Sequence, residues 1–389
     1  MRIYWIHGLY STIVFGEKVW GGLVRTKSTQ LLLKSIIPSA EIIDVVIKRP
    51  FEMTRKQSSG FLQFPLEMSS TIMRGFSKFL RKIPPLKELG IGLNSISTKM
   101  RCRDLYEKLS KDNGEYLLVV DSIRGYMAIQ SVFDKIASKA LAVLYLSHNY
   151  EPEFVGSKFL WNYLEKVERR IITSSDLVLA VSMRDFKVFK HKYGVDNGKV
   201  IFLPNIYPVD SLELSKFKSP SISLILPDNW GTNAIHSTIS YISEAVRMSE
   251  KVKKLVIVGG IAGKISQQKK WGDAVIETYS FIKSRRKFLE TIGKAHIGVN
   301  FAFKSAGTNV KKYDYALTKQ VVLSNFIGAK GDLLPYEYTF LDKYDLASKI
   351  DQIFDRDYLK MGEENALFAY KLYQKAKDKI KAKLLEMLK

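Results

Sequence analysis

Short, uninterrupted apolar segments recur along this chain, and segments with helical spacing separate them. Tyr116–Asp121 and Leu177–Val181 are two of these apolar segments, and Lys254–Val258 is a third. A strand that is apolar on both faces is typical of a parallel sheet that helices cover on both sides. The sequence therefore predicts an α/β protein built on parallel sheets.

The alternation of strands and helices gives way to a polar stretch, Asp210–Pro220, which we interpret as a hinge or linker, and then restarts. A chain of 389 residues is also long for a single core. We therefore expect two doubly wound, Rossmann-like domains, residues 1–207 and 208–360, that face each other across a cleft. Ligands bind beyond the carboxyl ends of the strands in such sheets. The sequence of residues 361–389 predicts a basic amphipathic helix. We expect this helix to pack against the first domain.

The strands predicted in the first domain are Ile3–Ile6, Glu41–Ile47, Tyr116–Asp121, Leu141–Ser147, Leu177–Val181 and Val200–Leu203. Those in the second are Ser221–Leu226, Lys254–Val258, His296–Phe301 and Gln320–Ser324. The helices predicted are Leu23–Ile36, Leu160–Ile172, Asn233–Met248, Phe288–Lys294 and Val310–Lys319, with helical sequence from about Asp345 onward.

The formal net charge of +22 indicates an acidic partner such as an anionic lipid, a phosphorylated substrate or a nucleic acid. A generally lysine-rich proteome is the alternative explanation. An insertion at about 48–111 concentrates the charge, with Arg74, Lys78, Arg81 and Lys82 near one another. Ile72–Arg81 has apolar residues at helical spacing. It is either a core-facing helix with a solvated basic face or an interfacial helix on anionic lipid.

Several common site types find no support in the sequence. The segment Gly259–Lys264 resembles a phosphate-binding loop, but its spacing is short and Ile265 stands where Ser or Thr would bind magnesium. Asp355 and Asp357 form an acidic pair that a solvated turn between helices explains. The five histidines lack the spacing of metal ligands. We therefore expect neither a metal site nor a cofactor.

Two further features of the sequence predict where in the cell the protein is found. Cys102 is the single cysteine, which excludes a disulfide within the chain and fits a reducing compartment. No apolar run approaches the ~18 residues of a membrane span, and the Ile3–Ile6 run is too short for a signal sequence. We expect a cytoplasmic protein that binds peripherally to the inner face of the membrane.

Three stretches together resemble a known family. Leu144–Phe154 (LYLSHNYEPEF) places His148, Asn149 and Glu151 just past a strand. In Leu164–Phe186 a helix ends at an Asp, and a strand then leads to Ser182, which can cap the next helix. Lys199–Pro208 (KVIFLPNIYP) closes the first domain. Their order resembles the retaining GT-B glycosyltransferases of family 4, and Phe15–Thr26, with Gly21 and Gly22, resembles the N-terminal glycine loop of that family.

A second part of the resemblance lies in the stretch SAGTNVKKYDYALTKQVVLSN, from Ser305 to Asn325. Gly307 lets a ligand approach the backbone, and Asn309 can cap a helix that begins with Lys311 and Lys312. Lysine there opposes the helix dipole but strengthens an anion site. The resemblance implies that Lys311 binds the diphosphate of a nucleotide-sugar and that Asp314 holds its ribose. A pair of Lys311 and Asp314 on a solvated face is the alternative.

The resemblance implies the remaining site assignments. His148 lies near the sugar, and Lys311 stabilises the leaving diphosphate. Lys312 assists it, and Gly259, Thr308 and Asn309 belong to the donor site. Gly21, Gly22, Asn149 and Glu151 form the acceptor or phosphate loop, and Arg74, Lys78, Arg81 and Lys82 form a membrane patch.

The chain departs from the family pattern at three places. Ala306 stands where the family has the first glutamate of its paired motif. The glycine expected near the end of the first strand of the second domain is absent, and Leu226–Asn233 (LPDNWGTN) stands there. Asp314 is one methylene shorter than glutamate.

The predicted function is transfer of a sugar from a nucleotide-sugar to a hydroxyl acceptor, with retention of configuration and without metal. A lipid-linked glycan or glycolipid is the expected acceptor. Two alternatives remain open. A GT-B-like sugar-nucleotide epimerase needs carboxylates for proton transfer, and no convincing pair is evident. A nucleic-acid-binding protein needs aromatic side chains clustered among basic ones, and the aromatic residues here are dispersed.

Overall fold

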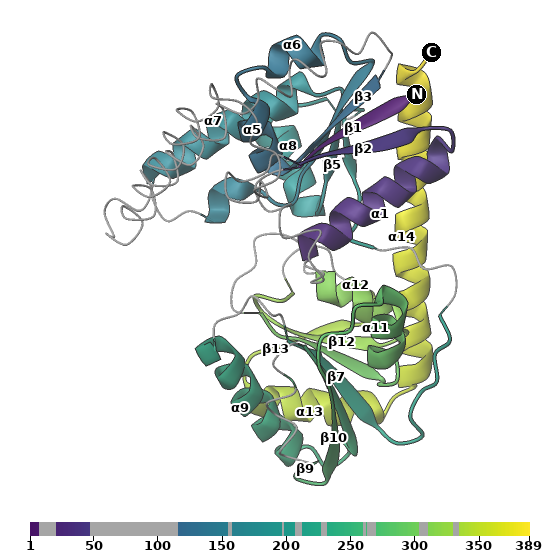
Figure 1. The fold of residues 1–389 in the computed structure, drawn as a ribbon. Coiled ribbons are helices and arrows are strands. Elements are labelled where there is room, and N and C mark those ends of the chain that lie inside the picture. Colours follow the sequence, from purple (N-terminus) through teal and green to yellow (C-terminus); the bar gives the residue numbers. More distant parts are fainter. Residues whose placement is uncertain are drawn as a thin grey trace, which may run out of the picture.

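The structure is a computed structural model that describes residues 1–7, 21–46, 116–154, 158–196, 198–206, 212–226, 232–259, 262, 270–302, 310–329 and 334–389. It contains two sheets, one in each half of the chain, with helices on both faces of each (Figure 1). This arrangement confirms the predicted doubly wound α/β architecture.

The first sheet has six parallel strands in the order β2-β1-β3-β4-β5-β6. They are β1 (Arg2–His7), β2 (Glu41–Val46), β3 (Tyr116–Asp121), β4 (Ala142–Leu146), β5 (Leu177–Ala180) and β6 (Val200–Phe202). The chain adds β2 on one side of β1 and β3 on the other, so the strand order reverses between β1 and β3. Ligands of doubly wound sheets bind at such a switch point, beyond the strand ends. In this sheet it lies next to His7 and Asp121, which are paired in register.

Helices cover the two faces of this sheet in two groups. Helices α5 (Ser122–Ile129), α6 (Phe133–Ala137), α7 (Lys158–Ser174) and α8 (Met183–Tyr193) share one core with it, and α1 (Gly21–Ile36) lies on the opposite face. A short 3-10 helix, η4 (Glu151–Phe154), connects β4 to α7. The sequence analysis did not identify α5 and α6, which are short and directly follow β3.

The second sheet has seven strands in the order β13-β12-β11-β7-β8-β10-β9, and only β9 is antiparallel within it. They are β7 (Ser221–Ile225), β8 (Lys254–Val258), β9 (Lys270–Trp271), β10 (Ala274–Tyr279), β11 (Ile297–Asn300), β12 (Val321–Asn325) and β13 (Glu337–Phe340). The strand order reverses between β7 and β11. The sequence analysis missed β9, β10 and β13, because they lie toward the edges and carry polar residues rather than continuous apolar runs.

Helices also cover both faces of the second sheet. Helices α9 (Thr232–Met248) and α13 (Lys343–Phe354) pack on one face, and α11 (Arg285–Ile292), α12 (Val310–Leu317) and α14 (Tyr358–Met387) pack on the other. Figure 1 shows α12 on the side of this half that is turned toward the first half. None of the helices in the described part of the chain combines the length and apolar character needed to cross a membrane.

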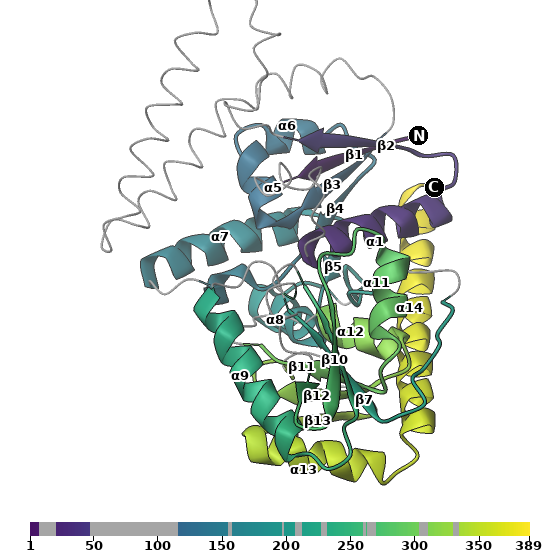
Figure 2. The same ribbon diagram turned by 60° about the horizontal axis from the view of Figure 1, so that its bottom comes forward.

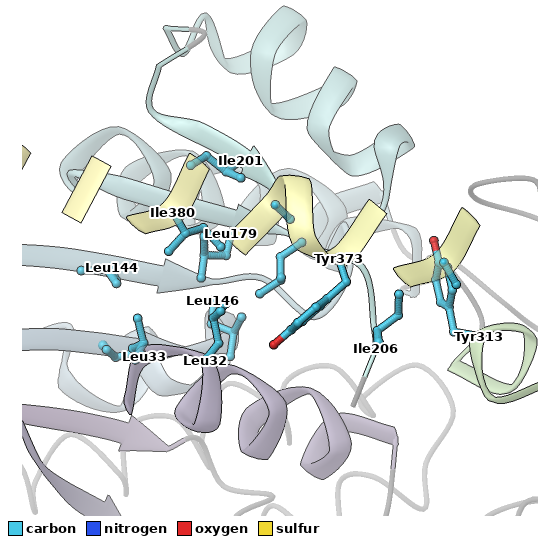
Figure 3. Packing of buried hydrophobic residues seen from close by; sticks show 14 of the residues in the cluster. Leu32, Leu33, Leu144, Leu146, Leu179, Ile201, Ile206, Tyr313, Tyr373 and Ile380 are labelled. Carbon is cyan, nitrogen blue, oxygen red and sulfur yellow. The ribbon is translucent and has the colours of Figure 1, made fainter. Parts of the chain in front are cut away.

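Helix α14 belongs to the cores of both halves, and both ribbon views show it along one side of the molecule (Figures 1 and 2). Near its start, the Asn365 side chain donates to the carbonyls of Gln320 and Tyr336 and accepts from the Tyr336 N–H. Further along, Tyr373 and Ile380 share an apolar cluster with residues of α1 and β4–β6 (Figure 3). One helix therefore connects the two sheets.

The start of α8 is built as the sequence predicts. Ser182 is the N-cap, and its hydroxyl accepts a hydrogen bond of 3.0 Å from the Asp185 N–H. The Asp185 side chain is fully buried, and this burial raises the pKa of its carboxyl to about 7, although Ser182 and the Tyr150 backbone favour the charged form. An acid with a raised pKa in the folded state keeps a proton that the unfolded chain releases. Folding stability therefore falls as the pH rises from about 4 to 7.

We expect Asp185→Asn to weaken this pH dependence, because asparagine cannot ionise. Between about pH 4 and 7, the free energy of unfolding of the wild type should fall relative to the variant by up to about 1.4 kcal/mol per pH unit. Urea unfolding at several pH values measures the difference. Asp273→Asn, at an exposed carboxyl, is the matched control and should follow the wild type. Parallel curves for wild type and Asp185→Asn would show that Asp185 does not carry the linkage.

Candidate functional site

A buried arginine donates hydrogen bonds to the carboxyl ends of three strands in the first half. Arg25, in the first turns of α1, donates to the carbonyl oxygens of Ser147 (2.7 Å), Leu179 (2.8 Å) and Leu203 (2.9 Å). These carbonyls lie at the ends of β4, β5 and β6. The guanidinium also donates to Asn205 Oδ1 at 3.2 Å, in the segment Lys199–Pro208 that closes the first domain. Burial lowers the pKa of Arg25 to about 9. The arginine thus fixes α1 to the strand ends that carry the predicted site.

The predicted catalytic residue His148 is held by an aspartate that the sequence analysis did not select. His148 Nε2 lies 2.5 Å from Asp121 Oδ1, at the end of β3. The other carboxyl oxygen accepts hydrogen bonds from Trp5 Nε1 (2.9 Å) and Thr26 Oγ1 (2.7 Å). Burial alone would raise the pKa of Asp121, but the histidines His148 and His7 outweigh it and hold this pKa well below its usual range. Asp121 is therefore a carboxylate that orients His148.

A second histidine, His7, belongs to the same network. Its Nδ1 lies 3.4 Å from Asp121 Oδ2, and its Nε2 lies 2.8 Å from Asp44 Oδ1. Gln30 of α1 also donates to Asp44, at 2.6 Å. The sequence could have pointed to these residues only through their places along the chain. His7 and Asp121 are the last residues of two strands, and these strands flank the switch point. Without the strand order, their proximity could not be derived.

The other two residues of the His148 loop have different surroundings. Ser147 Oγ donates to the Asn149 carbonyl at 3.1 Å, and the Glu151 N–H donates to Glu168 Oε1 of α7 at 3.4 Å. Burial raises the pKa of Glu151, against the opposing charges of Arg124 and His148, and raises that of Glu168 well above its ordinary value. Glu168, the glutamate on the helix that precedes Ser182, therefore holds the His148 loop through the hydrogen bond that it accepts from the Glu151 N–H.

In the second half, Lys311 lies at the switch point between β7 and β11. Its Nζ is 2.8 Å from the Phe301 carbonyl, just past β11, and 3.4 Å from the Ile225 carbonyl, at the end of β7. Burial lowers the pKa of Lys311 to about 7, although the Asp314 charge opposes the shift. Lys311 and Asp314 are both buried, so their pairing on a solvated face, the alternative given above, is wrong.

Lys312 and Asp314 each form an ion pair of their own. Lys312 Nζ lies 2.9 Å from Glu337 Oε2 of β13, and neither side chain is exposed to solvent. Asp314 pairs with Arg285 of α11. These contacts connect α12 to its neighbours and account for both residues structurally. Lys312 is consequently the weaker candidate for a donor contact.

Gly259 directly follows β8, which pairs with β7 on the side away from β11. Its φ of 156° is a conformation that side chains rarely adopt, and a Cβ there would lie 2.3 Å from the Leu226 carbonyl. Glycine is therefore required for the close approach of the ends of β7 and β8. This steric need explains Gly259 whether or not a donor contacts it.

Other predicted site residues are placed only in part. Gly21 and Gly22 begin α1. Gly307, Thr308 and Asn309 lie outside the described residues, as do Arg74, Lys78, Arg81 and Lys82. Within the described ranges, His, Cys, Asp and Glu form no group of three or more that could hold a metal ion. Asp355 pairs with Lys251, and Asp357 accepts a hydrogen bond from the Lys360 N–H at the start of α14.

No family model and no curated protein matches the chain in sequence. Solved structures do match. A glycosyltransferase from Rickettsia africae has a TM-score of 0.57 at 12% identity, over 100% of this chain and 98% of that one. HepE from Anabaena, in complex with UDP-glucose, has a TM-score of 0.55 at 11% identity, over 98% of this chain and 100% of that one.

TarM from S. aureus, in a complex that contains UDP and alpha-GlcNAc-glycerol, has a TM-score of 0.53 at 15% identity. The match covers 75% of this chain but only 58% of TarM, so the chain spans less than two thirds of that protein. At these identities the likeness concerns the fold. The two sheets, their strand orders and these matches together establish that the chain has the GT-B fold of glycosyltransferases.

Proposed function

We propose that this protein transfers a sugar from a nucleotide-sugar donor to a hydroxyl acceptor. The observation that carries the proposal is the position of Lys311, whose ammonium lies at the switch point of the second sheet. Ligands of doubly wound sheets bind at this point. A nucleotide-sugar brings a diphosphate, which a buried cation beside a helix N-terminus can bind. HepE and TarM, which share the fold, were solved with UDP-glucose or UDP.

In this proposal Lys311 stabilises the negative charge that develops on the leaving diphosphate. A preorganised cation in a site with little water acts strongly on such charge, so the step needs no metal. His148 contacts the sugar from the first half, and Asn149 and Glu151 belong to the acceptor side. Retention of configuration rests on the family resemblance and is part of the proposal. The epimerase alternative has less support, because Asp121 is committed to two histidines and Asp314 to Arg285.

A thermal-shift screen of nucleotide-sugars tests donor binding. A donor at 100-fold over its dissociation constant should stabilise the folded protein by about 2.7 kcal/mol. Product formation with the identified donor and simple hydroxyl acceptors should continue in excess EDTA. Loss of activity in EDTA that manganese restores would show that the reaction requires a metal. Absence of a shift with any nucleotide-sugar, together with salt-sensitive retention on DNA, would favour a nucleic-acid-binding protein.

The variant Lys311→Met tests the diphosphate contact. It removes a charge-assisted interaction of about 1.5–3 kcal/mol, which corresponds to about 10- to 150-fold weaker donor binding. The wild type should bind the donor less tightly as the pH rises through about 7, because Lys311 loses its proton. The variant should lose that part of the pH dependence. Calorimetric titrations at several pH values measure both effects. Wild-type affinity and pH dependence in the variant would remove Lys311 from the donor site.

Two control variants separate binding from stability. Lys287→Met removes an exposed lysine of the neighbouring helix α11 and should leave donor affinity unchanged. Lys312→Met leaves the Glu337 carboxylate buried without its cation, which should lower the free energy of unfolding by about 3–5 kcal/mol. Urea unfolding measures this loss. Donor affinity falling in Lys312→Met without loss of stability would promote Lys312 to a donor contact.

We further propose a lipid-linked glycan or glycolipid as the acceptor, and peripheral binding to the inner, anionic face of the cytoplasmic membrane. The support is the sequence: residues 48–111 contain 14 Lys or Arg against 5 Asp or Glu, among aromatic residues. Each basic residue near an anionic leaflet contributes about 1 kcal/mol, and the attraction fades with salt.

Sedimentation with vesicles tests the membrane proposal. Binding to anionic vesicles should weaken in high salt and should drop when Arg74, Lys78, Arg81 and Lys82 are changed to Gln. The control is Lys360→Gln with Lys371→Gln, in helix α14, which should bind like the wild type. Equal partition onto neutral and anionic vesicles, or onto neither, would favour a soluble acceptor.

A further inference from the structure

Two histidines in the first half share one buried carboxylate. Asp121 is 5% exposed, and its Oδ1 faces His148 Nε2 at 2.5 Å. Its Oδ2 faces His7 Nδ1 at 3.4 Å, in addition to the hydrogen bonds from Trp5 and Thr26. A carboxylate between two imidazoles couples them, because a charge on one ring changes how strongly the carboxylate attracts a proton to the other.

His7 has a carboxylate at each ring nitrogen. Nδ1 faces Asp121 and Nε2 faces Asp44. Only the imidazolium can donate from both nitrogens. Burial alone would lower the pKa of His7, but its hydrogen bonds to Asp121 and Asp44 and their charges outweigh the burial and raise this pKa. The geometry therefore favours a buried cation between two anions.

We propose that His7 is a positioning residue that acts on His148 through Asp121. The positive charge of His7 offsets the charge of Asp121. The carboxylate then orients His148 through the Nε2–H hydrogen bond while its charge is shared with His7. An imidazole that donates from Nε2 and carries no second proton can accept a hydrogen bond from a hydroxyl group at Nδ1. The functional meaning of this acceptor rests on the proposed function, in which His148 contacts the sugar.

Several charged side chains surround this network, and the variants that test the proposal leave these side chains unchanged. Arg25 and Lys27 of α1 interact electrostatically with Asp121 and Asp44, respectively. Glu151 of η4 interacts with His148, and Arg124 of α5 interacts with Glu151. The two ends of the network reach solvent, since the side chains of His148 and Asp44 are 19% and 28% exposed. Both ends can therefore exchange protons with water.

The experiment follows the histidine rings by NMR in the full chain labelled with 15N-histidine, over pH 5–9. In the wild type, the shifts should show His7 protonated on both nitrogens near neutral pH and His148 as the Nε2–H tautomer. In His7→Gln, Asp121 faces His148 alone, so His148 should take up its second proton at a higher pH in the variant than in the wild type. Asp44→Asn weakens the charge on His7 and should move His148 in the same direction.

The control is His191→Gln, which removes an exposed histidine of α8 and should leave the His148 signals unchanged. If His7→Gln does not fold, Asp44→Asn, at the more exposed end of the network, still decides the question. An unchanged His148 titration in the folded variants would overturn the inference, as would an Nδ1–H tautomer in the wild type.

Kinetics separate this inference from the proposed function. If transfer is observed, the pH profile of kcat should move to higher pH in His7→Gln and Asp44→Asn, which a purely structural role for His7 would not produce. Unmoved profiles in active variants would overturn the positioning role even if transfer itself is confirmed. If no nucleotide-sugar binds but the His148 titration moves as expected, the proposed function fails and the coupling between the two histidines is supported.

Discussion

Each half of the molecule depends on a buried cation that meets the carbonyl groups at the ends of parallel strands. Buried carbonyls at the ends of strands need hydrogen-bond donors, because a buried carbonyl without a donor is costly. Arg25 donates to three of them in the first half, and Lys311 lies against two in the second. In both cases the cation comes from a helix and fixes that helix over the edge of the sheet where ligands bind.

The chemistry of the two cations differs in a way that matters for function. Arginine stays protonated under all ordinary conditions, and its planar fork is matched to several acceptors at once, so Arg25 is suited to a permanent structural role. Lysine loses its proton readily when it is buried, and the pKa of Lys311 is lowered to about 7. Lys311 can therefore lose or regain its charge near neutral pH, whereas Arg25 stays charged there. The fold uses similar positions for a fixed contact in one half and for a responsive one in the other.

The strands of both sheet centres could be predicted from the sequence, because continuous apolar runs such as Tyr116–Asp121 leave few alternatives. The partners of the site residues could not, because they depend on strand order and register. His7 and Asp121 are 114 positions apart and meet only because β1 and β3 are neighbours. Lys312 could be interpreted as an anion-binding residue only while its partner was unknown. That partner, Glu337, lies in β13, which carries too little apolar sequence to be recognised as a strand.

Helix α14 has a consequence for how this chain folds. Its first turns are bound to the second sheet through Asn365, and its later turns fill the core of the first half with Tyr373 and Ile380. The first half alone would leave the apolar surface of Leu32, Leu146 and Leu179 open to water, although most of its own sequence would already be present. The two sheets are thus separate in architecture, but the stability of both depends on the same helix. Helix α14, Tyr358–Met387, completes the core of the first half, so the stability of that half depends on a helix that also belongs to the second.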